Sequence, residues 1–362
     1  MLLKKIPSAC LFAFLFAFGF LSSTALAGKA QLSWEPPTTN ADGTPLTDLA
    51  GYKVYYGTSK RMSTCPNETH GYSNVVNVGN VATYKINNLP DGFTYYFSVT
   101  AYDTSGNEGC FSEEVNKTIP IYFTKTPFTI NLDGVVSEQI WNHSFSAFSK
   151  PLLTDNTVKV YSLWDEQKLY FGFEVTDNSI ETVQSSRDSN VMVDDSVEIL
   201  IDTLNDGSQS MQNDDYRFVI SANGVVWDGR GNGILGNSGD SSWNSQVSVN
   251  SRREGGKYTI EVAIPLSDIG MVSSYGKIVG LFFAVNDRDS GSLRRLYMNE
   301  TADLNTPKNW AKSILMHRSD ENRNSCIEMT ELLSFIGFWQ SDSTAYPIKE
   351  LMETIGFWKK GC

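Results

Sequence analysis

The chain has 362 residues, which is long enough for two or more domains that each bury a core of their own. Its formal net charge of −12 at pH 7 repels phosphate backbones and anionic lipid head groups, so we expect no nucleic-acid partner. The three histidines, His70, His143 and His317, show no paired spacing. They give no support to a histidine zinc site, and each is expected at the surface.

The first 27 residues have the pattern of a cleaved secretory signal. Lys4 and Lys5 precede an apolar run, and small residues follow at Ala25 and Ala27. The run is short for a membrane span, although an uncleaved anchor is the alternative. Beyond Ala27 no stretch approaches the roughly 20 apolar residues of a membrane helix. We therefore expect a secreted protein with no membrane span after cleavage.

Four cysteines remain once the signal with Cys10 is removed. They fall two by two into separate regions, as disulfides in an oxidising compartment do. The predicted pairs are Cys65 with Cys110 and Cys326 with Cys362.

Short β-rich runs alternate with turn clusters between residues 28 and 120, which is typical of a β-sandwich. Trp34 followed by a proline pair, then Leu89, Tyr95 and "VTAYDTSGNEG", resembles the fibronectin type III domain. The resemblance implies that Trp34 packs in the core and that the Tyr95 hydroxyl bonds back to the chain at a strand corner. It implies a spacer and not a binding site.

Longer strands follow between residues 121 and 318, among them "VKVYSLWDEQKLYFGFEVTD", "DDSVEILID" and "VGLFFAVNDRD". They predict a second, larger, jelly-roll-like sandwich. The order of these segments resembles the family 9 carbohydrate-binding modules. The expected fold is therefore all-β, with two β-sandwich domains in tandem and a small C-terminal helical hairpin at residues 319–362.

The last segment begins with "DENRNSCIEMTE", whose oxygen-bearing side chains have the spacing of a calcium loop. Positions one, three, five, nine and twelve are Asp320, Asn322, Asn324, Glu328 and Glu331. Ser325 stands where the sharp turn of such a loop has glycine. The repeat "ELLSFIGFW" and "ELMETIGFW" then predicts two helices. The segment resembles a dockerin, which implies a cohesin-like or cell-surface protein partner, but it has one calcium loop instead of two. A disulfide-closed helical hairpin is the alternative.

Acids interrupt the apolar stretch "NVMVDDSVEILID" at residues 190–202. In a strand, Val197, Ile199 and Ile201 would face the core, and the other face would carry acids on an open surface. Those residues are Asp194, Ser196, Glu198 and Asp202. The resemblance implies that Glu198 hydrogen-bonds a sugar hydroxyl. Further sugar-binding candidates are Met192, Arg217, Trp227, Trp243 and Trp310, with Tyr297 beside them. Core packing is the alternative for these aromatic residues.

Sugar-binding members of the family hold the ring between two tryptophans, and this sequence has Met192 and Leu304 at those positions. The resemblance also implies a structural calcium ion at Asp177, which Glu138, Asp188 or Asp195 could join.

The predicted function is a secreted, non-catalytic protein that binds polysaccharide or oligosaccharide. One alternative is a glycosidase with two carboxylates about 5 to 10 Å apart, such as Asp195 and Glu198. The other is a haem-binding relative with Met192 as a ligand.

Overall fold

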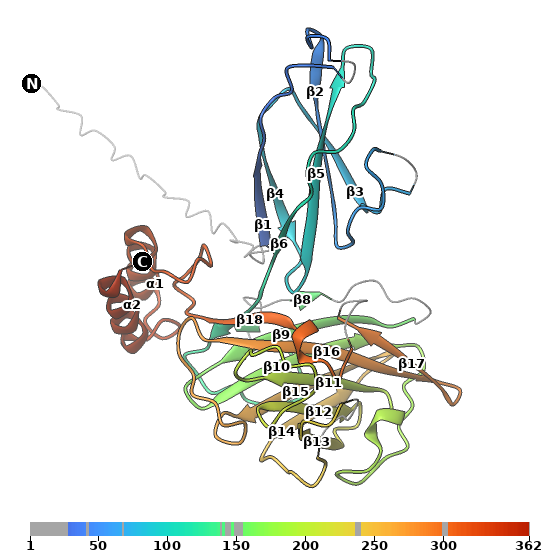
Figure 1. Cartoon of the computed structure of the whole chain (residues 1–362). Coiled ribbons are helices and arrows are strands. Elements are labelled where there is room, and N and C mark those ends of the chain that lie inside the picture. Colours follow the sequence, from blue (N-terminus) through green and yellow to red (C-terminus); the bar gives the residue numbers. More distant parts are fainter. Residues whose placement is uncertain are drawn as a thin grey trace, which may run out of the picture.

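Two groups of strands and a pair of helices follow one another along the chain (Figure 1). The computed structural model describes residues 28–40, 43–66, 69–137, 140–141, 146–147, 155–235, 240–298 and 303–361. The predicted signal at residues 1–27 lies outside the described residues. The expected all-β fold with a short helical tail is confirmed.

The first group consists of two small sheets that share one apolar core. The two-stranded sheet pairs β1 (Gly28–Ser33) with β4 (Thr83–Leu89). The second sheet has the order β3-β2-β5-β6, formed by β2 (Leu49–Gly57), β3 (Asn74–Gly79), β5 (Thr94–Asp103) and β6 (Val115–Thr118). The hydroxyl of Tyr95 donates to the carbonyl of Pro90 at 3.3 Å, which is the expected bond back to the chain. Trp34 is partly buried and meets Tyr52 edge to face.

The predicted disulfide between Cys65 and Cys110 is present in this first sandwich. Cys326 is also disulfide-bonded. Its predicted partner, Cys362, lies outside the described residues. One of the two predicted pairs is therefore confirmed, and the other stays a prediction.

The second group is a large sheet that curls into two layers (Figure 1). Its main path has the order β13-β12-β11-β16-β18-β7-β9-β10-β15-β14. The strands are β7 (Ile121–Lys125), β8 (Ser146–Ala147), β9 (Thr157–Trp164), β10 (Lys168–Thr176), β11 (Ser196–Asp202), β12 (Asp215–Ser221), β13 (Val226–Arg230), β14 (Ser248–Arg253), β15 (Lys257–Pro265), β16 (Ile278–Asp289), β17 (Ser292–Tyr297) and β18 (Ala311–Met316). The rings of Phe171 and Phe173 in β10 lie 5.7 and 5.6 Å from that of Phe283 in β16, so these distant strands face each other across the core.

The side chains of β11 alternate between the core face and the outer face of its layer. Val197, Ile199 and Ile201 belong to the main buried cluster, as the alternation predicts. On the outer face, Glu198 pairs across β12 with Val219 and across β16 with Ala284. The same row continues to Trp227 in β13 and Tyr297 in β17. Because residues opposite one another on neighbouring strands share a face, this row defines one side of the layer.

The two predicted helices are present as α1 (Met329–Ser341) and α2 (Ile348–Lys360). They are docked on the second sandwich, because Lys125 Nζ lies 2.6 Å from Glu353 and the ring of Tyr275 lies 4.6 Å from that of Phe357. Neither helix of the described chain combines the length and the apolar run needed to cross a bilayer.

The prediction of surface histidines is wrong for His317. Its side chain is buried between the rings of Phe335 and Phe357, and its Nδ1 lies 2.7 Å from the Ser319 hydroxyl. The two helices therefore cover a residue that was predicted to lie at the surface. His70 is half-buried, and His143 lies outside the described residues.

Candidate functional site

A charged cluster forms the centre of the outer face around Glu198. Its Oε2 accepts hydrogen bonds from Arg217 Nε at 2.9 Å and Nη2 at 2.6 Å. Its Oε1 accepts from Asn286 Nδ2 at 2.8 Å and lies 3.3 Å from Arg295 Nε. We call Glu198, Arg217, Asn286 and Arg295 the polar floor. Arg295 is its most exposed charged member, with 27% of its side chain exposed.

The expectation that Glu198 lies on an open surface is wrong. Its side chain is 0% exposed, because Arg217 and Asn286 reach over it from the two neighbouring strands. The ion pair with Arg217 compensates for the loss of water around the carboxylate. Glu198 therefore holds the two arginines in place, and its oxygens are already used within the protein.

Two segments frame the polar floor. On one side, the short 3₁₀ helix η2 (Val191–Val193) places Met192 in a cluster with Val219 and Trp227. On the other side, Trp310 directly precedes Ala311, which pairs with Leu281 of β16, and the Trp310 Nε1 donates to the carbonyl of Asp303, the residue before Leu304. Met192 and Leu304 thus lie near the polar floor. These are the two positions at which sugar-binding members of the family have tryptophans. Met192 belongs to η2 and not to β11, which begins at Ser196.

The aromatic candidates divide between the two faces of the layer. Trp227 and Tyr297 share the row of Glu198, and the guanidinium of Arg217 lies 5.6 Å from the centre of the Trp227 ring. Trp243 packs instead on Tyr216 and Phe218, which face the core, so its assignment to the sugar site is wrong. Trp310 is buried, and its Nε1 donates to the carbonyl of Asp303 at 3.4 Å.

The remaining acids of this stretch are also buried, which contradicts the expected exposure of Asp194 and Asp202. Asp194 accepts a hydrogen bond from the amide of Val183 at 2.8 Å. Asp195 accepts from the amides of Glu181 and Arg288 at 2.5 and 2.7 Å, and burial raises its pKa to about 7. These aspartates fix the loop that follows β10. Asp195 and Glu198 serve separate networks and do not form the carboxylate pair that the glycosidase alternative requires.

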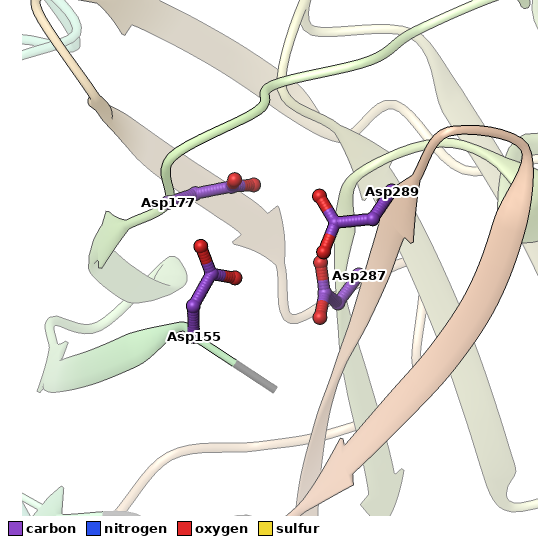
Figure 2. A group of neighbouring side chains, drawn as sticks. All are labelled: Asp155, Asp177, Asp287 and Asp289. Carbon is purple, nitrogen blue, oxygen red and sulfur yellow. The ribbon is translucent and has the colours of Figure 1, made fainter. Parts of the chain in front are cut away.

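Four aspartates from the two layers converge at one end of the sandwich (Figure 2). Asp155 precedes β9 and Asp177 follows β10, while Asp287 and Asp289 lie at the end of β16. Each offers a carboxylate oxygen within 4.8 Å of the others. We call Asp155, Asp177, Asp287 and Asp289 the four-aspartate group. Of these four residues, only Asp177 was predicted from the sequence.

The four-aspartate group fits a hard divalent cation. Asp287 is fully buried and neither of its carboxylate oxygens has a hydrogen-bond partner, and Oδ2 of Asp177 also lacks one. Burial, followed by the charges of Asp289, Asp177 and Asp155, raises the pKa of Asp287 to about 6. Unpaired buried carboxylates are costly, and an all-oxygen ligand set suits calcium.

Three further metal candidates were predicted near Asp177, namely Glu138, Asp188 and Asp195. Asp188 is exposed and lies 3.9 Å from Arg187 Nε, so its assignment to this metal site is wrong. Asp195 accepts hydrogen bonds from two backbone amides, and its carboxylate also lies beside that of Asp177, so its part in this site stays a prediction. Glu138 lies outside the described residues. Asp287 and Asp289 had one signal in the sequence, which is their spacing of two residues at the end of "VNDRD".

The C-terminal loop has the backbone turns that its ligand spacing requires. Asp320 accepts hydrogen bonds from the amides of Asn324 at 3.1 Å and Ser325 at 2.9 Å. Glu331 accepts from the amides of Asn322 and Glu328, each at 3.0 Å. Ser325, at the glycine position, has a φ of 64°. Calcium binding by this loop stays a prediction.

Replacing Ser325 with glycine is expected to raise the free energy of unfolding by up to about 1 kcal/mol. A left-handed conformation costs an L-residue roughly 1–2 kcal/mol, and the greater freedom of glycine in the unfolded chain offsets part of this gain. Thermal melts with and without calcium measure the change. Ser325→Ala is the control, because it keeps the strained φ and removes only the hydroxyl. A glycine variant less stable than the alanine variant would contradict the argument.

Comparison with known proteins gives one family match over the second sandwich. Residues 132–316 match the family described as "Carbohydrate family 9 binding domain-like". The chain is 27% identical over 166 residues to the exoglucanase XynX of Acetivibrio thermocellus, covering 45% of this chain and 14% of that protein. It is 28% identical over 171 residues to endo-1,4-beta-xylanase A of Thermoanaerobacterium saccharolyticum, covering 45% and 13%. The chain thus spans only 7% to 14% of the curated relatives that it matches.

A solved family 9 carbohydrate-binding module from Caldicellulosiruptor kristjanssonii, in complex with cellotriose, is similar to the same part of the chain. The identity is 25%, the TM-score is 0.46, and the alignment covers 55% of this chain and 95% of that module. The same module in complex with glucose gives a TM-score of 0.45.

Proposed function

The chain belongs to the carbohydrate family 9 binding domain-like family, and from this premise we propose that its second sandwich binds an oligosaccharide or polysaccharide without cleaving it. The observation that carries the proposal is the polar floor, set on one face between Trp227 and Tyr297 and framed by η2 and the 303–310 segment. Charged and amide side chains beside aromatic rings are the groups that bind sugar hydroxyls and the apolar faces of pyranose rings.

The structure changes the role of Glu198 within this proposal. Because its oxygens are used by Arg217 and Asn286, Glu198 is a positioning residue. Arg295 is the better candidate for direct contact, since it is partly exposed and a guanidinium carries five N–H donors. The half-buried Met192 and Tyr297 offer the apolar surfaces on either side.

Titration of the full chain with short cello- and xylo-oligosaccharides tests the proposal. Arg295→Ala is expected to weaken binding at least tenfold, since hydrogen bonds to charged groups contribute about 1.5–3 kcal/mol. Arg252→Ala is the matched control, because Arg252 is an exposed arginine on β14 in the other layer. Failure of the wild-type chain to bind any oligosaccharide of the panel would reject the function. Equal weakening by both variants would reject the site.

The remaining modules complete the proposal. We assign residues 28–120 as a fibronectin type III spacer and residues 319–362 as a dockerin-like docking tail, both in a secreted protein. The disulfide of the first sandwich supports export to an oxidising compartment. The exposed apolar side chains Leu333, Ile348 and Met352 on the helices support a cohesin-like or cell-surface protein partner. Calcium is assigned to the four-aspartate group as a structural ion, and to the Asp320 loop.

A further inference from the structure

A cavity of about 670 Å³ lies between the two sandwiches. The first sandwich meets the second end-on, where β6 leads into β7 beside β18 (Figure 1). On the first sandwich, the cavity is lined by the turn after β2, the start of β5 and the end of β6. On the second, it is lined by residues 308–312. We call it the inter-sandwich cavity.

Two contacts between the sandwiches hold the walls of this cavity in place. Gly92 of the first sandwich lies against Met298, so closely that a Cβ at Gly92 would be 2.8 Å from the Met298 Cε. Arg323 Nη1, from the C-terminal loop on the second sandwich, lies 3.1 Å from Asp91 Oδ2. Both side chains of this ion pair are largely buried, at 14% and 5% exposed. The cavity is therefore a fixed part of the fold.

The cavity is lined by neutral polar groups, aromatic rings and cations. The chain carries a net charge of −12, yet no aspartate or glutamate is among the described residues that line the cavity. Lys308 and Lys312 line it with exposed side chains, and neither forms an ion pair with a described carboxylate. Lys60 Nζ lies 5.8 Å from the centre of the Tyr96 ring on the opposite wall. Cations gathered in a cleft of an acidic protein favour an anionic ligand.

The inter-sandwich cavity and the polar floor share the outer face of one layer. Lys312 of β18 is the cross-strand partner of Gly280 in β16. Four residues further along β16, Ala284 is the cross-strand partner of Glu198. Because side chains alternate along a strand, Lys312 and Glu198 point to the same side. The distance along β16 between these two positions is about 13 Å, which an oligosaccharide of a few units spans.

We propose that the inter-sandwich cavity binds a carboxylate-bearing unit, a uronic acid, of the saccharide chain whose neighbouring units lie on the polar floor. The half-buried ring of Tyr96, together with the hydroxyl and amide groups of the walls, suits a sugar ring. The ammonium groups of Lys308 and Lys312 suit its carboxylate. This inference rests on the proposed function. It gives the first sandwich a part in binding, in addition to its role as a spacer.

Titration of the full chain with two kinds of xylo-oligosaccharide tests the inference. One kind is neutral, and the other carries a glucuronic acid branch, with the branch placed in turn on each unit. The wild type is expected to bind the best branched ligand about fivefold more tightly than the neutral one, since each exposed ion pair contributes modestly. High salt is expected to remove most of this preference, because it screens exposed charges.

The double variant Lys308→Ala, Lys312→Ala is expected to lose the preference for the branched ligand and to keep the affinity for the neutral one. Lys60→Ala is expected to lose part of the preference, because its cation comes from the first sandwich. Lys85→Ala is the matched control, since it removes an exposed lysine on β4 that does not line the cavity.

Three outcomes would overturn the inference, and only one of them also rejects the proposed function. Equal affinity of the wild type for both kinds of ligand would show that the cavity takes no uronic acid, with sugar binding by the polar floor intact. A preference that survives in the double lysine variant would place the carboxylate elsewhere. Failure of the wild type to bind either kind would reject the proposed function and this inference together.

Discussion

Replacement of Glu198 with alanine is expected to lower the free energy of unfolding by about 3–5 kcal/mol, the usual cost of removing one partner from a buried ion pair. Glu198 is 0% exposed and Arg217 is 6% exposed. Truncation would leave the Arg217 guanidinium buried beside the Trp227 ring without its counter-charge. Urea denaturation with an unchanged m-value measures the loss.

A double substitution separates the ion pair from the packing. Glu198→Leu combined with Arg217→Met replaces the pair by apolar side chains of similar size, which is often neutral or stabilising. We expect the double variant to recover most of the stability that Glu198→Ala loses. A cost below about 1 kcal/mol for Glu198→Ala would show that the pair is hydrated and would contradict its buried geometry.

The same double variant tests whether the polar floor binds the sugar. It keeps the fold but loses two of the four floor residues, so it is expected to bind oligosaccharides at least tenfold more weakly than the wild type. Loss of binding in a stable protein cannot be attributed to unfolding. Retained binding in that variant would place the sugar elsewhere on the chain.

The face assignments of β11 could be predicted from the sequence, but the exposure of its acids could not. Alternation correctly sends Val197, Ile199 and Ile201 to the core, because side-chain direction in a strand is a local property. Burial of Glu198 depends on Arg217 and Asn286, which are 19 and 88 residues away along the chain. Only the register of three strands brings them together, and register is not a local property.

The metal ligands likewise could be predicted from the sequence only in part. Asp177 was predicted through a family resemblance, whereas Asp155 reaches it because Thr157 pairs with Thr176 across β9 and β10. Asp287 and Asp289 come from the opposite layer. A pair of aspartates at alternate strand positions indicates a shared face, but the sequence does not say which loops that face meets. The turn at Ser325, in contrast, was predictable because its cause lies within one loop.

Removal of calcium is expected to destabilise the second sandwich through the four-aspartate group, because the group joins its two layers. An ion that binds only the folded state contributes RT ln(1 + [L]/Kd), about 2.7 kcal/mol at a concentration 100 times Kd. For a domain of this size that corresponds to a shift in Tm of about 5–10 °C. Thermal melts in calcium and in excess chelator measure it, and no difference between the two conditions would contradict a structural calcium ion.

The variant Asp287→Asn tests whether the calcium-dependent shift in Tm comes from the four-aspartate group and not from another calcium-binding candidate of the chain. Both oxygens of Asp287 are buried without a protein partner, so neutralising the side chain removes a charge that only a cation could compensate. The variant is expected to melt higher than the wild type in chelator and to lose this group's share of the calcium-dependent increase. Asp188→Asn is the control, since that exposed aspartate lies outside the group and should leave both melts unchanged. If Asp287→Asn lowered Tm equally with and without calcium, Asp287 would be a packing residue, and the two layers would be held together at this end without an ion.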